Sequence, residues 1–206
     1  MLPHIDLAQS WYHGTDATIG SWQVPPPPKP GEGMAVPHTA VFFSTDRSFA
    51  AAAGTCLYAA HLAPEAKVLD VTVSSSSSEA LRQAVARNKL AALSAYIGDR
   101  HGWVAGWKTG EVLRFAMHEP VAALYLARMV EGAMRSHGLS KEAAVVVIKH
   151  NTTRGLIELV CSEARKLGFD ALMGNETDGP PNARRAVPWL AVFDARAITS
   201  PQAIKP

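Results

Sequence analysis

Two short segments near the start of the chain carry the residues best suited to chemistry. They are residues 11–15, WYHGT, and residues 41–46, VFFSTD, and each reads as a strand that ends in polar residues. A histidine at one strand end and an aromatic pair at the other can hold a flat, charged ring between them, because aromatic faces attract cations. The two segments therefore predict a binding site for such a ring.

The same segments resemble the nicotinamide-binding core of ADP-ribosyltransferases, specifically the diphtheria-toxin-like branch with its His, Tyr and Glu signature. That branch has a Tyr-His-Gly-Thr strand, followed by an aromatic-aromatic-Ser-Thr-Asp strand that runs into an alanine-rich helix. In this chain the helix corresponds to the small-residue stretch at 48–54, SFAAAAG.

The C-terminal part is similar to the end of phage and polymorphic-toxin ADP-ribosyltransferase domains. The matching motifs are LGFDAL at 167–172, GNE at 174–176, LAVFD at 190–194 and ITS at 198–200. The resemblance covers about residues 10–73 and 154–200, and leaves the region between them unassigned.

The resemblance implies a mono-ADP-ribosyltransferase that cleaves NAD at the bond between nicotinamide and ribose. ADP-ribose would pass to a macromolecular acceptor, in the first instance a protein, as in a toxin or effector. Bond cleavage would proceed through an oxocarbenium-like transition state, which a preorganised carboxylate stabilises. Glu176 is the candidate for that carboxylate, with Asp178 as its nearest alternative.

The remaining expected site residues surround the NAD molecule. The resemblance implies that His13 acts with Glu176 and holds the adenosine-side ribose, while the Gly14 backbone anchors the nicotinamide carboxamide. Phe43 would stack on the nicotinamide ring. Thr15, Ser44 and Tyr58 complete the expected binding set, and we expect His13, Phe43 and Glu176 to line one cleft.

Two departures from the family pattern keep other functions open. Phe43 stands where the family often has tyrosine, which preserves stacking but removes a hydroxyl contact. A second family tyrosine would fall near Gly54 or Thr55, where none is present, and Tyr58 is a substitute for it. The alternatives are a non-catalytic binding protein with the same fold, or an NAD-dependent enzyme that acts on nucleic acid.

Composition and residue spacing argue against several other classes of function. A formal net charge of +2 gives no electrostatic case for nucleic acid or membrane binding. The eight histidines show no metal-ligand spacing, so we expect no metal, and no glycine-rich loop indicates a Rossmann or Walker site. Two distant cysteines and the absence of a signal or long apolar run favour the cytoplasm, or delivery into a target cell by a route that the sequence does not reveal.

Hydrophobic periodicity, together with the positions of glycine, proline and helix-capping residues, predicts the elements that must position these residues. We expect one α+β domain over 1–206, with an ADP-ribosyltransferase-like pair of small, mainly antiparallel sheets and a helical insertion at about 79–150. A helix from 153 should end at Gly168, a polar loop should span 174–185, and 140–148 fits more than one kind of element. The expected strands are 9–13, 40–43, 56–62, 67–73, 170–173 and 189–193; the other expected helices are 47–53, 119–134 and one that starts near Ser77 or Ser78.

Overall fold

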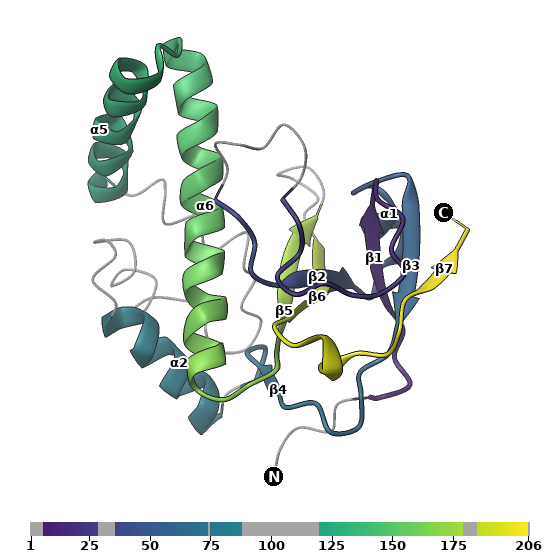
Figure 1. The fold of residues 1–206 in the computed structure, drawn as a ribbon. Helices are drawn as coiled ribbons and strands as arrows, with labels where there is room; N and C mark the ends of the chain where they lie inside the picture. Colours follow the sequence, from purple (N-terminus) through teal and green to yellow (C-terminus); the bar gives the residue numbers. More distant parts are fainter. Residues whose placement is uncertain (1–5, 29–35, 74, 88–119, 179–184, 206) are drawn as a thin grey trace.

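The strands form one open, mostly antiparallel sheet in a computed structural model that describes residues 6–28, 36–73, 75–87, 120–178 and 185–205 (Figure 1). Their order is β4-β5-β6-β2-β1-β3-β7. The expectation of two separate small sheets is wrong, because β2 pairs with β6 along one edge and with β1 along the other. The strands are β1 Trp11–Thr15, β2 Val41–Ser44, β3 Cys56–Ala60, β4 Val68–Asp70, β5 Ala171–Asp178, β6 Arg185–Val192 and β7 Gln202–Ile204.

The helical region is a consequence of the parallel pairing between β4 and β5. β4 and β5 are neighbours that run in the same direction, and parallel neighbours require a long crossover connection. The chain makes this crossover with α2, α5 and α6, which lie to one side of the sheet in Figure 1. The helices are α1 Arg47–Ala51, α2 Ser76–Arg87, α5 Pro120–His137 and α6 Lys141–Lys166, with a short 3-10 helix at Ala195–Ala197. Residues 88–119 of the expected helical insertion lie outside the described residues.

The long helix α6 corrects the expectation that a helix begins at 153. It is continuous over 26 residues and includes 141–148 of the ambiguous segment, with Ser140 as its N-cap. The Ser140 hydroxyl caps its start by accepting a hydrogen bond from the Ala143 amide at 3.2 Å, and Gly168, with φ +87°, follows its end as expected. Packing decides the ambiguity: Ala144 and Ile148 are buried against α5, which overrides the weak helix propensity of the valine run.

The hairpin of β5 and β6 is longer than expected. Its register runs without interruption from Ala171 opposite Val192 to Asp178 opposite Arg185. The expected polar loop at 174–185 is therefore wrong at both ends, because a strand needs only backbone pairing and tolerates polar residues. The start of α2 also differs, since Ser75, rather than Ser77 or Ser78, caps it by accepting from the Ser78 amide at 3.1 Å.

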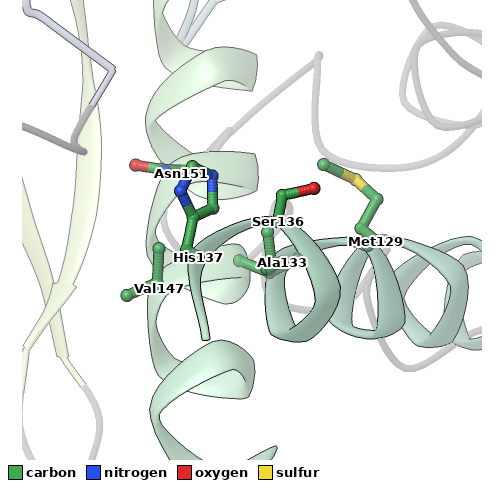
Figure 2. Close-up of a pocket in the computed structure, with 8 residues that line it drawn as sticks. Met129, Ala133, Ser136, His137, Val147 and Asn151 are labelled. Atoms are coloured by element: carbon green, nitrogen blue, oxygen red, sulfur yellow. The ribbon is translucent and has the colours of Figure 1, made fainter. Parts of the chain in front are cut away.

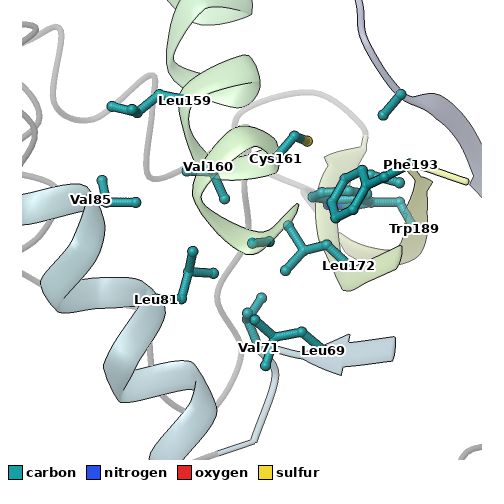
Figure 3. Close-up of a cluster of buried hydrophobic side chains, with 13 residues drawn as sticks. Leu69, Val71, Leu81, Val85, Leu159, Val160, Cys161, Leu172, Trp189 and Phe193 are labelled. Carbon is teal, nitrogen blue, oxygen red and sulfur yellow. The ribbon is translucent and has the colours of Figure 1, made fainter. Parts of the chain in front are cut away.

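The main core lies between the sheet and the helices α2 and α6 (Figure 3). Leu81 and Val85 of α2 and Leu159 and Val160 of α6 meet the sheet at Leu172. A second cluster covers the opposite face of the sheet, to which no α-helix of the described residues contributes. It contains Trp11, Trp22, Val41, Phe43, Tyr58, Leu190 and Ile198, with Ala197 of the 3-10 helix. Because both faces of the central strands are buried, these strands are the part of the fold best shielded from solvent.

Helix α1 approaches β1 so closely that glycine is required at the contact. A Cβ atom at Gly14 would lie 1.8 Å from the Ala50 carbonyl oxygen, and one at Gly54 would lie 2.5 Å from the Thr15 carbonyl oxygen. Both neighbours are backbone atoms that cannot rotate away. The small-residue stretch is thus explained by a helix packed tightly on a strand, as its composition predicts.

We expect Gly14→Ala to destabilise the protein by about 3 kcal/mol, because the added methyl group forces α1 away from β1. Gly20→Ala is the matched control, since nothing lies within 4 Å of the corresponding Cβ position. Urea unfolding of the two variants measures the difference. A Gly14 variant as stable as the Gly20 variant would contradict the close contact.

Candidate functional site

His13 lies where β1 and β2 separate. Among the described residues, the pairing of these two strands is registered at one position, Tyr12 opposite Ser44. Beyond it, the His13 Nδ1 atom lies 2.7 Å from the carbonyl oxygen of Phe42. Because that oxygen only accepts, Nδ1 carries the proton, and the imidazole side chain links the two strands where backbone pairing stops.

An aromatic cluster surrounds His13 on the face of the sheet opposite α2 and α6. The ring of Phe43 is 5.5 Å from that of His13, and Phe43 itself is only 3% exposed. Trp22 contacts both, with ring centroids 4.9 Å from Phe43 and 5.7 Å from His13, and it lies 6.2 Å from the ring of Tyr58. The structure therefore brings His13, Phe43 and Tyr58 together, with an indole ring packed among them.

Hydrogen bonds hold Trp22 and its loop in this position. The Trp22 Nε1–H group donates to the carbonyl oxygen of Thr199 at 2.7 Å. The Tyr58 hydroxyl accepts from the Ile19 amide at 2.8 Å, so Tyr58 anchors the loop. Trp22 belongs to none of the sequence motifs, and its one signal is its place just ahead of the proline run.

The small polar residues of the predicted site are engaged in the local structure. Thr15 is buried, and its hydroxyl accepts from the Ala17 amide at 3.2 Å. Ser44 donates to the Pro188 carbonyl oxygen at 3.1 Å and accepts from the Asp46 amide at 3.0 Å. Asp46 in turn caps α1 by accepting from the Phe49 amide at 2.9 Å, as expected of a helix N-terminus.

Glu176 lies on β5, and β6 separates β5 from β2. Its backbone pairs with that of Val187. Across the sheet, Phe43 of β2 lies opposite Leu190 of β6, and Leu190 lies opposite Met173 of β5. Position 176 is three residues beyond Met173 on β5. Since strand positions alternate between faces, the register does not bring position 176 to the face that His13 and Phe43 share.

A polar cluster on the other face was not anticipated from the sequence. Glu158 of α6 accepts hydrogen bonds from His38 Nδ1 at 2.8 Å and from the Thr39 amide and hydroxyl at 2.9 and 2.6 Å. Arg154 Nε donates to His38 Nε2 at 3.0 Å, so the His38 ring bridges Arg154 and Glu158, with Nδ1 as the donor to Glu158. A carboxylate among the apolar residues of α6 was the available signal, but its partners lie about 120 residues away.

The charge of Glu158 is maintained by these donors. Burial raises the pKa of Glu158, but the hydrogen bonds from His38 and Thr39 outweigh burial and hold its pKa below the ordinary value of 4.5. The cluster thereby fastens the segment before β2 to α6. His38 also packs edge-on against Phe42, at 4.8 Å between centroids, which continues the contact into the sheet.

A cavity of about 330 Å³ lies between α5 and α6 (Figure 2). The elements that line it are different from those that form the aromatic cluster. Figure 2 shows Met129, Ala133 and Ser136 of α5 facing Val147 and Asn151 of α6. None of the residues predicted for the NAD site lines this cavity. Its apolar walls belong to the small core that joins the two helices.

Comparisons of the chain with models of protein families, with curated proteins and with solved structures found no match. Within the described ranges, no three His, Cys, Asp or Glu side chains are grouped so as to hold a metal ion. In the same part of the chain, no helix combines the length and apolar character needed to cross a membrane.

We expect Glu158→Gln to lower the free energy of unfolding at pH 7 by about 1–3 kcal/mol, because the neutral amide cannot satisfy all three donor groups. The folded-state pKa is depressed, so the stabilisation is full above pH 4.5 and is lost as the pH falls through the folded pKa. Urea unfolding of wild type and variant from pH 7 down to pH 3 should show the gap narrowing.

Glu131→Gln is the control for this measurement, since Glu131 is exposed and lies 3.9 Å from Arg135. It should change stability by less than about 0.5 kcal/mol at either pH. A gap for Glu158→Gln that is constant with pH would show that the carboxylate charge does not matter.

Proposed function

We propose that the chain binds NAD where β1 and β2 separate, and that it transfers ADP-ribose from NAD to a macromolecular acceptor. The observation that carries this proposal is the His13 imidazole, which is fixed on the Phe42 carbonyl oxygen beside the ring of Phe43. The Nδ1–H bond orients the ring, as binding a ribose hydroxyl through His13 requires. The resemblance of residues 10–73 and 154–200 to ADP-ribosyltransferases supports the same assignment.

The proposed reaction breaks the bond between the ribose and the positively charged nicotinamide ring. Nicotinamide leaves as a neutral molecule, so the protein has no leaving group to protonate. Positive charge develops on the ribose, and a nearby carboxylate lowers the free energy of that transition state. Glu176 is the proposed carboxylate, and the Gly14 backbone and the Phe43 ring are the proposed contacts for nicotinamide.

A second candidate function is non-catalytic binding by a protein of the same fold. Two observations favour it. Phe43 is 3% exposed and covered by Trp22, and the register of β5 assigns Glu176 to the face opposite Phe43. In this alternative, the aromatic cluster is a core that stabilises a binding surface elsewhere.

The proposed acceptor is a protein, with a nucleic acid as the alternative acceptor. The net charge of +2 provides no general attraction for phosphates, which favours the protein. The proposed setting is the cytoplasm, either of the cell that makes the protein or of a target cell that receives it as a toxin or effector.

We expect Glu176→Gln to reduce nicotinamide release from NAD by about 10²–10³-fold, because the substitution keeps the size of the side chain and removes its charge. NAD affinity should change much less, since the charge acts mainly as the bond breaks. The measurement is the rate of nicotinamide release at matched NAD saturation, with cell lysate added as a source of acceptors.

Asp178→Asn provides the comparison, because it removes a carboxylate from the same strand two residues away. It should retain most of the activity. Equal rates for wild type and Glu176→Gln would remove Glu176 from the mechanism. Absence of nicotinamide release by the wild type, with or without lysate, would favour the non-catalytic function.

A further inference from the structure

The Trp22 side chain occupies the aromatic cluster in the way that a bound ligand would. Its indole is a flat ring in edge contact with Phe43 and His13, with interplanar angles of 78° and 87°. Its one polar group, Nε1–H, donates to the Thr199 carbonyl oxygen at 2.7 Å. The indole therefore fills a site with aromatic walls and a single hydrogen-bond acceptor at its end.

We propose that this site takes a flat aromatic ring bearing an N–H donor, and that such a ring enters by displacing Trp22. The inference rests on the proposed function for the identity of the ring, which is the nicotinamide of NAD. A carboxamide N–H would replace the indole N–H on the Thr199 carbonyl oxygen, which takes the place of the Gly14 backbone as the carboxamide anchor, while the pyridine ring would contact Phe43 and His13. Trp22 thus competes with the ligand for the same walls.

The loop that carries Trp22 is attached through side chains, since Ile19, Trp22 and Val24 pack into the cluster on this face of the sheet. At its base, Asp16 accepts a hydrogen bond from the Thr55 amide at 3.0 Å. Further along, the Ile19 amide donates to the Tyr58 hydroxyl, and Trp22 donates to Thr199. The loop contains neither helix nor strand over 16–28, so its displacement breaks these contacts without opening a backbone ladder.

The Thr199 carbonyl oxygen predicts which rings are accepted. Nicotinamide supplies an N–H donor, whereas nicotinate presents a carboxylate that cannot donate and is repelled by the carbonyl dipole. A buried carbonyl oxygen that loses its donor is costly, which makes such sites selective for the donor. Nicotinate should bind at least tenfold more weakly than nicotinamide.

Calorimetric titration of nicotinamide into wild type and Trp22→Ala tests the proposal. The affinity of the wild type is reduced by the small fraction of molecules in which the site is open, so removing the indole should tighten binding by at least tenfold. Trp22→Phe is the matched comparison: it keeps a ring against Phe43 but lacks the indole N–H, so its affinity should lie between those of wild type and Trp22→Ala. Equal affinity of wild type and Trp22→Ala for nicotinamide would overturn the proposal.

Indole serves as the probe for an emptied site. Trp22→Ala should bind indole, and binding of indole without binding of nicotinamide would overturn the proposed ligand class. If Trp22→Ala does not fold, Asp16→Ala releases the base of the loop from an exposed position and should tighten nicotinamide binding severalfold; an unchanged affinity would again overturn the proposal. Nicotinamide binding by these variants, combined with no NAD cleavage by wild type, would refute the transferase and retain the site.

Discussion

β4 and β5 lie side by side and run in the same direction, so the chain has to return along the sheet between residues 70 and 171. The helices α2 and α6 of this crossover cover one face of the sheet, and α1 packs on the same face at Gly14. The other face is left for segments without α-helices, namely the loop around Trp22 and the C-terminal residues near Ile198. The candidate site lies on this second face, where Trp22 from the loop packs against His13 and Phe43.

Local patterns were sufficient to predict most of the elements. The strands β1 to β4 have alternating or β-branched residues between glycine and proline signals, and Asp46 marks the start of α1. The continuity of α6 could not be predicted, because contacts of Ala144 and Ile148 with α5 decide it. The outer halves of β5 and β6, and all of β7, were missed because backbone pairing holds them and their side chains carry no strand pattern.

The parts of the site that could be predicted are those carried by strand ends. His13, Phe43 and Tyr58 meet because β1 pairs with both β2 and β3, which brings motifs on adjacent strands together. Trp22 reaches the cluster from a loop, and Glu158 meets His38 across about 120 residues of chain. Such contacts depend on the whole topology, so no local sequence pattern predicts them. The face assigned to position 176 depends likewise on a hairpin register that the sequence pattern left open.

The strand order has a consequence for the time course of folding. β2 sits between β1 and β6, so one of its edges has no partner until residues 185–192 have been synthesised, some 140 residues later. β3 likewise acquires β7 from the last residues of the chain. Pairings this distant in sequence slow folding, and unpaired edges expose nascent chains to association with one another. Until residues 185–192 and 202–204 have been synthesised, the strands β2, β3 and β5 each have one edge without its native partner.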